Sequence, residues 1–159
     1  MKLYIMNKKH ERVDSNEFFK KIYFNEFKEE LNLNEIKFLV NGKPFLNKKI
    51  YFNISHSKNY IGVVISKSEV GLDLEEKSRK IHKVFKSKII EQEEIIINPL
   101  NNWVIKEAYS KFLGLGLKMD FKTISAREIL NKKFVYNIVD EKLFCCVVGL
   151  ENLESINYI

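Results

Sequence analysis

The run from Val70 to Glu75 constrains the fold most, because apolar residues alternate in it with Gly71, Asp73 and Glu75. In a β-strand this alternation puts the valine and both leucines on one face and the two carboxylates on the other. Asp is depleted in strands, and two carboxylates on one face repel each other unless a cation or a shared proton relieves them. The pattern predicts a packed sheet whose acidic face is either a metal site or an exposed strand surface.

Composition favours one domain with a sizeable core. The chain has 159 residues, of which 45% are hydrophobic and 13% aromatic, and only 6 Gly and 2 Pro leave little room for long linkers. A net charge of +6 favours an anionic partner, such as a nucleic acid, a phosphorylated small molecule or an acidic protein. No apolar run is long enough to cross a bilayer, and the N-terminus lacks a signal-peptide core, so we predict a cytoplasmic protein without a membrane partner.

Hydrophobic periodicity predicts helices over 15–31 and 81–97, and a third from Asn101 or Asn102 to Leu113. Asp14 and Glu17 have the character of a capping box for the first helix. Short strands are predicted over 2–6, 36–40, 50–54, 60–65, 70–74, 134–139 and 142–148. Divided near residue 69, each half offers a helical stretch followed by paired strands.

Two adjacent cysteines, Cys145 and Cys146, lie in an apolar run. Neighbouring residues of a strand point to opposite faces, which places these thiols poorly for a mutual disulfide. We interpret them as reduced packing residues, with a catalytic thiol as the alternative.

The third helix carries Glu107 and Lys111 four residues apart, hence on one face, with Trp103 one turn earlier. A surface ion pair of about 0.2–0.5 kcal/mol is the ordinary interpretation. If the helix brings Glu107 against Asp73 and Glu75, however, three carboxylates can hold a Mg²⁺ that keeps waters and binds phosphate oxygens. Lys111 would then be a phosphate ligand.

Two further candidate phosphate ligands, His56 and Lys43, lie in turns. His56 belongs to the polar loop Ser55–Asn59, where it is either a hydrogen-bonded turn residue or a donor to a phosphate, helped by the serine hydroxyls and the loop amides. Lys43, in a Gly-Lys-Pro turn, is either a rigidly presented cation or a solvated lysine.

Four motifs together resemble the 4'-phosphopantetheinyl transferases, specifically the larger surfactin-synthetase-activating type. They are Gly42–Pro44, the Asn-Ile-Ser-His-Ser loop 53–57, the Gly-Leu-Asp-Leu-Glu strand 71–75 and the Trp-x-x-Lys-Glu-Ala-x-x-Lys helix 103–111, in the order of the family. The N-terminal half is shorter than in larger members, since only about fifty residues precede Phe52.

The resemblance implies transfer of 4'-phosphopantetheine from coenzyme A to a serine of an apo acyl or peptidyl carrier protein, releasing adenosine 3',5'-bisphosphate. By this likeness Asp73, Glu75 and Glu107 bind Mg²⁺, and Glu107 and Lys111 are the catalytic residues. Coenzyme A would be held by five residues: Lys43, Ser55, His56, Lys106 and Lys111. Such enzymes serve fatty acid, polyketide or nonribosomal peptide biosynthesis.

The resemblance also implies an α+β fold with a pseudo-twofold axis, in which two small antiparallel sheets are packed with helices. We expect one domain over 1–159 made of two half-domains, about 1–69 and 70–159, acting as a monomer with coenzyme A between the halves.

Two alternatives remain open at this point. The shortened N-terminal half favours a non-catalytic relative that binds coenzyme A or a carrier protein without transfer, whereas the three retained carboxylates oppose it. A nucleic-acid-binding domain would cluster its lysines with stacking aromatic residues on one face. The lysines here are spread along the chain, so we expect no nucleic-acid partner.

Overall fold

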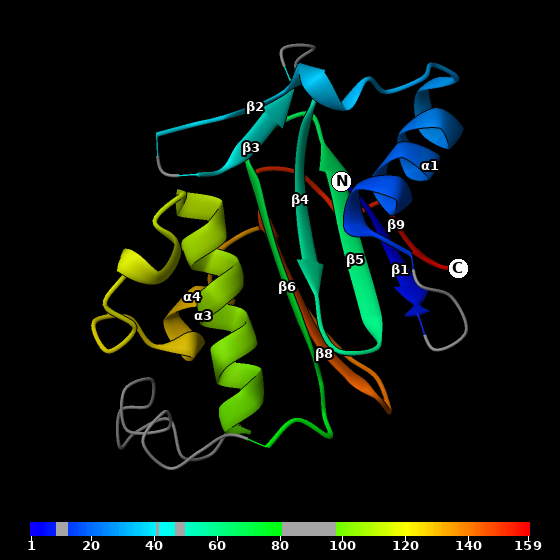
Figure 1. Cartoon of the computed structure of the whole chain (residues 1–159). Coiled ribbons are helices and arrows are strands. Elements are labelled where there is room, and N and C mark those ends of the chain that lie inside the picture. The colour runs from blue at the N-terminus through cyan, green and yellow to red at the C-terminus, as the bar shows by residue number, and fades with distance from the viewer. Residues whose placement is uncertain (9–12, 41, 47–49, 81–97) are drawn as a thin grey trace.

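The computed structural model describes residues 1–8, 13–40, 42–46, 50–80 and 98–159. Its helices and strands form a layered α+β arrangement with two main sheets and a small hairpin (Figure 1). The helix predicted over 81–97 lies outside the described residues.

The first sheet has the strand order β4-β5-β1-β9, with β4 at Tyr51–His56, β5 at Tyr60–Ser66, β1 at Lys2–Asn7 and β9 at Ser155–Tyr158. Its pairs are antiparallel except for β1 and β9, which run parallel. Helix α1, at Ser15–Phe27, packs on one face through its buried aromatic side chains.

The second sheet has the order β6-β8-β7 and is antiparallel throughout, with β6 at Val70–Glu76, β8 at Leu143–Gly149 and β7 at Val135–Val139. Helices α3 (Pro99–Leu113) and α4 (Ala126–Leu130) cover its outer face, with the short helix η4 (Gly116–Lys118) between them in sequence. A short helix η2 (Leu33–Glu35) leads into the hairpin of β2 (Ile36–Phe38) and β3 (Pro44–Leu46).

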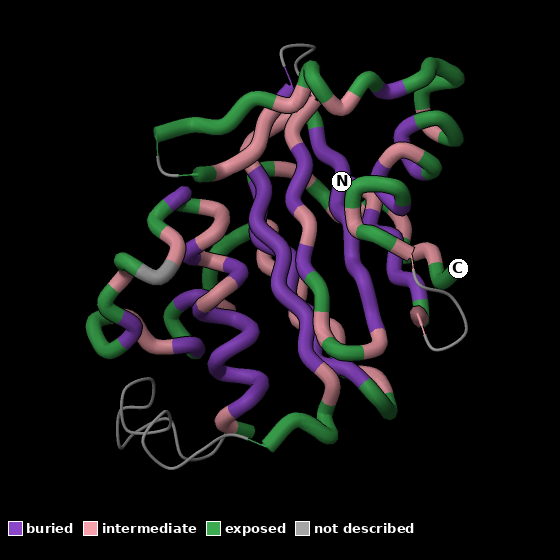
Figure 2. The backbone as a smooth tube through the Cα atoms, viewed as in Figure 1, coloured by how far each residue is buried: buried purple, intermediate pink, exposed green. Residues whose placement is uncertain are grey.

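Three hydrophobic cores lie between these layers. Successive side chains of a strand point to opposite faces, so one strand contributes to two cores. On β1, Tyr4 and Met6 face α1, whereas Leu3 and Ile5 belong to the core between the two sheets. A third core lies between the second sheet and α3. Figure 2 accordingly shows buried backbone along the central strands and along α3.

The two cysteines confirm the prediction from strand alternation. Both are free and buried, with Cys145 in the core between the sheets and Cys146 in the core under α3. Burial raises the pKa of both thiols, which disfavours the reactive thiolate. They are packing residues.

The helix ends differ in part from prediction. Helix α1 ends at Phe27 and not at residue 31, because Lys28 adopts a left-handed conformation with φ 55°. Asp14 is its N-cap residue but makes no side-chain capping hydrogen bond, so the predicted capping box is not formed. Helix α3 begins one turn early, where the Asn98 side chain accepts a hydrogen bond from the backbone N–H of Leu100, and ends before Gly114 as predicted.

The mixture of helices with small sheets agrees with the predicted α+β class. The pseudo-twofold relation and the two half-domains stay predictions. In the described part of the chain, no helix is both long and apolar enough to span a bilayer.

Helix α3 rests directly on β6 at Gly71. A Cβ atom there would overlap the backbone carbonyl of Ala108 and the backbone nitrogen of Phe112. Only glycine therefore allows the helix to approach the strand this closely, and this approach sets the distance between the side chains of Glu107 and Lys111 and the acidic face of β6.

We expect Gly71→Ala to lower the free energy of unfolding by about 1–3 kcal/mol, because backbone atoms of α3 must move to admit the methyl group. Urea denaturation followed by circular dichroism measures the loss. Gly149→Ala is the control, since its Cβ would meet side-chain atoms of Met1, an unbranched residue, and not the backbone of a helix. Equal losses for the two variants would contradict the assigned role of Gly71.

Candidate active site

A row of carboxylates lies where β6 faces α3. Asp73 and Glu75 follow Gly71 at alternate positions of β6, and both are buried. The intervening leucines pack between the sheets, as the alternation predicted. Glu107 and Lys111 approach this row from α3.

Asp73 is contacted from both β4 and α3 and is 5% exposed. Its Oδ1 accepts hydrogen bonds from Ser55 Oγ and from Lys111 Nζ, each at 2.8 Å. Its Oδ2 is buried and has no hydrogen-bond partner among the described residues. One oxygen is thus satisfied within the protein and the other is left without a donor.

Strand β4 meets the free edge of β6 through side chains. Asn53 Oδ1 accepts a hydrogen bond from the backbone N–H of Leu72 at 3.1 Å, and Ser55 Oγ accepts one from that of Leu74 at 3.4 Å. Asn53 and Ser55 are two residues apart, so both point to the same side of β4. This side-chain seam joins the two sheets and places the Ser55 hydroxyl against Asp73.

Glu107 is an acid with an unusual environment. Burial raises the pKa of Glu107, and the nearby negative charge of Asp73 raises it further, while Lys111 and Arg79 oppose the rise. Its Oε2 is buried without a hydrogen-bond partner in the described part of the chain. The negative charges of Glu107 and Asp73 therefore repel each other, and each side chain keeps a buried oxygen without a hydrogen-bond partner among the described residues.

Arg79 forms an ion pair with the carboxylate of Glu75. The guanidinium reaches back over the turn that follows β6, where the backbone N–H of Arg79 donates to the carbonyl of Glu76 at 2.9 Å. Two carboxylates of the row are thus paired with cations of the protein itself, Asp73 with Lys111 and Glu75 with Arg79.

His56 stands at the end of β4, beside the end of β6. The Glu76 carboxylate accepts hydrogen bonds from the backbone N–H of Asn59 at 3.0 Å and from its side-chain amide at 2.7 Å, which fastens the β4–β5 turn to β6. A polar cavity of about 600 Å³ opens there, lined by residues 56–58 and by Glu75, Glu76, Ser78 and Arg79.

Lys43 and Lys106 have structural partners. Lys43 Nζ donates to the carbonyl of Phe112 at 3.0 Å, near the end of α3, and forms an ion pair with Glu69. Lys43 and Lys111 both line a cavity of about 220 Å³. Lys106 is 0% exposed, and its Nζ donates to the carbonyl of Phe121 at 2.8 Å. For both lysines, coenzyme A binding stays a prediction.

The carboxylates of the row offer the kind of ligand atom that a hard cation such as Mg²⁺ requires. The unpartnered Oδ2 of Asp73 and Oε2 of Glu107 are anionic oxygens, which are the ligands that Mg²⁺ prefers. In the arrangement described, however, no three Asp, Glu, His or Cys side chains of the described residues are grouped closely enough to hold a metal ion together. Glu75, held by Arg79, would have to join the other two.

Sequence reasoning left three residues of this site without a role. Asn53 is the first residue of the Asn-Ile-Ser-His-Ser motif, and its spacing from Ser55 on a strand was the available signal. Glu76 and Arg79 gave no signal, because the contacts of Glu76 depend on the placement of the β4–β5 turn and that of Arg79 on the turn after β6.

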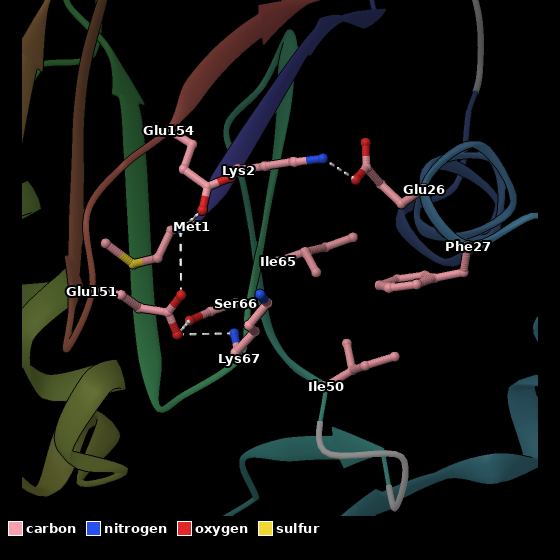
Figure 3. Close-up of a pocket in the computed structure, with 10 residues that line it drawn as sticks. All are labelled: Met1, Lys2, Glu26, Phe27, Ile50, Ile65, Ser66, Lys67, Glu151 and Glu154. Atoms are coloured by element: carbon pink, nitrogen blue, oxygen red, sulfur yellow. Dashed lines mark hydrogen bonds and ion pairs between the residues drawn. The ribbon is translucent and has the colours of Figure 1, made fainter.

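A separate cavity of about 320 Å³ lies between α1 and the first sheet, and none of the predicted site residues lines it (Figure 3). Four of its charged groups form ion pairs with one another. Lys2 Nζ contacts Glu26 at 2.6 Å, and the ammonium of Met1 lies 3.7 Å from Glu151. The carboxylate row is therefore the stronger candidate for chemistry.

The raised pKa of Glu107 predicts a pH-dependent cost to stability. The ionised form is disfavoured in the folded chain, so the cost is absent below the unfolded-state pKa of about 4.3 and grows as the pH rises through the higher folded-state pKa. We expect Glu107→Gln to be more stable than the parent at pH 7.5, with an advantage that shrinks towards pH 4.

Urea denaturation at both pH values in the presence of EDTA measures this difference. Glu141→Gln, which alters an exposed carboxylate in the β7–β8 turn, is the control. An advantage of Glu107→Gln that stayed constant with pH would contradict the electrostatic explanation.

Comparison with known proteins gives two similarities. A 4'-phosphopantetheinyl transferase of Aneurinibacillus migulanus is 30% identical over 131 residues, covering 66% of this chain and 54% of the relative. An L-aminoadipate-semialdehyde dehydrogenase-phosphopantetheinyl transferase of Candida glabrata is 30% identical over 104 residues, covering 53% of this chain and 40% of that protein. No protein-family model matches the chain.

The chain spans about half the length of the relatives it matches. Both relatives are named for phosphopantetheinyl transfer, which is the activity that the four motifs imply. These two similarities confirm the predicted resemblance to the 4'-phosphopantetheinyl transferase superfamily.

Proposed function

We propose that this protein transfers 4'-phosphopantetheine from coenzyme A to a serine of an apo acyl or peptidyl carrier protein. The observation that carries the proposal is the meeting of the buried Asp73 and the half-buried Glu107, each with a buried carboxylate oxygen, with Lys111 at the contact of β6 and α3. The names of the two relatives support the same activity.

Asp73, Glu75 and Glu107 are the residues that would hold a Mg²⁺. Two buried carboxylate oxygens without partners among the described residues support this assignment. When bound, the ion would neutralise the pyrophosphate of coenzyme A and the charge that develops during transfer.

Glu107 is the proposed general base. The serine oxygen of the carrier protein attacks the phosphorus that bears the pantetheine arm, and the bond from this phosphorus to the bridging oxygen of the pyrophosphate breaks. Adenosine 3',5'-bisphosphate leaves, and Glu107 takes the serine proton. Burial and the charge of Asp73 raise the pKa of Glu107 when no cation is bound, which makes this carboxylate the better proton acceptor of the row in that state.

Lys111 is the proposed ligand of the phosphate oxygens. It lies 2.8 Å from Asp73 Oδ1 and is 25% exposed, so its ammonium is held at the row and can still meet a substrate. Lys43, Ser55 and His56 would hold the nucleotide end. The net charge of +6 suits both coenzyme A and an acidic carrier protein.

The test of activity is mass spectrometry of an apo carrier protein after incubation with the protein, coenzyme A and Mg²⁺. We expect Asp73→Asn, Glu107→Gln and Lys111→Met each to lower kcat/KM by about 10²- to 10³-fold, because each removes a charge that acts at the reacting phosphate. Lys122→Met, which alters an exposed lysine after η4, should retain the parent rate.

No adduct on several carrier proteins would overturn the proposed activity. Coenzyme A binding in calorimetry without any transfer would select the non-catalytic alternative instead.

Metal removal provides an independent measurement. We expect excess EDTA to abolish transfer and excess Mg²⁺ to restore it, because the repulsion between Asp73 and Glu107 needs a cation in the active complex. Restoration must follow the concentration of free Mg²⁺. Undiminished transfer in EDTA would remove the metal from the mechanism.

A further inference from the structure

The two cations of the carboxylate row are held differently. Lys111 projects from α3 and contacts both Asp73 Oδ1 and Ser55 Oγ, the second at 3.3 Å. Arg79 lies in the turn after β6, its side chain is 48% exposed, and it forms an ion pair with Glu75. The guanidinium end of this pair is partly exposed and can move away into solvent, whereas the buried Glu75 carboxylate then needs another cation in its place.

The position that Arg79 occupies matters for a metal site. Glu75 is buried, and its carboxylate is neutralised by the guanidinium, whereas Asp73 and Glu107 each keep an oxygen without a partner among the described residues. A divalent cation that recruits Glu75 must therefore compete with Arg79. The positive charge of Arg79 also reaches Glu107, so it acts on the whole row.

The polar cavity beside Glu75 offers the guanidinium a second position. Arg79 lines this cavity together with His56, Ser57 and Lys58 from the β4–β5 turn. A guanidinium binds phosphate oxygens through two parallel hydrogen bonds, which makes arginine well suited to a phosphate next to a metal.

We propose that Arg79 is a displaceable counter-ion of the metal site. It holds Glu75 while the site lacks a divalent cation, is released when the cation binds, and then contacts phosphate oxygens of coenzyme A in the adjacent cavity. This inference rests on the proposed function and adds to it a residue that connects metal binding with substrate binding.

The test compares Arg79→Gln with Lys80→Gln, which removes the same charge from the next, exposed position. Mn²⁺ binding without nucleotide is measured by electron paramagnetic resonance of the free ion. We expect Arg79→Gln to bind Mn²⁺ about threefold to fivefold more tightly than the parent, because the competing cation is gone. Lys80→Gln reports the general effect of one lost charge and should change the affinity less.

The second measurement is calorimetric binding of coenzyme A in the presence of Mg²⁺. We expect Arg79→Gln to bind it about tenfold more weakly, since a charged hydrogen-bond donor to phosphate is lost. Unchanged or weaker Mn²⁺ binding by Arg79→Gln, or unchanged coenzyme A binding, would overturn the role of Arg79.

Asp73→Asn separates this failure from that of the proposed function. If the parent binds Mn²⁺, Asp73→Asn does not, and Arg79→Gln equals Lys80→Gln, the metal site stands and only the role of Arg79 falls. If the parent binds no Mn²⁺, the metal site and the role of Arg79 fall together.

Discussion

The close contact of α3 with β6 at Gly71 is the constraint on which the site depends. Strand β6 presents two carboxylates on one face, and helix α3 presents Glu107 and Lys111 on one side, but neither element forms the site alone. Because Gly71 has no side chain, the backbone of α3 lies against the strand, and Glu107 and Lys111 come within reach of Asp73. The chemistry follows from this approach of two backbones.

The price of this approach is a set of buried negative charges. Burying a carboxylate costs free energy unless donors or cations compensate it, and the row is compensated unevenly. Lys111 and Ser55 donate hydrogen bonds to one oxygen of Asp73, and Arg79 neutralises Glu75. Glu107 is compensated less, and its pKa is raised. Such uneven compensation is typical of functional sites, where stability is given up locally for reactivity.

The elements that build the site were predictable because their signals are local. The alternation in 70–76 and the stripe of α3, bounded by Asn98 and Gly114, identify a strand and a helix from neighbouring residues. The four-residue strand β9 was missed, since it is defined only by pairing with β1 at the other end of the chain. The partners of Lys106 and Arg79 were missed for a similar reason: the Phe121 carbonyl and the turn after β6 are positioned by tertiary folding.

The seam between β4 and β6 has a consequence for association. An open strand edge presents unpaired N–H groups that can template a strand from another chain, which is a common route to aggregation. On β6 the amides of Leu72 and Leu74 are already bound by the side chains of Asn53 and Ser55. The same two side chains that order the acidic row thus also close this edge to a foreign strand.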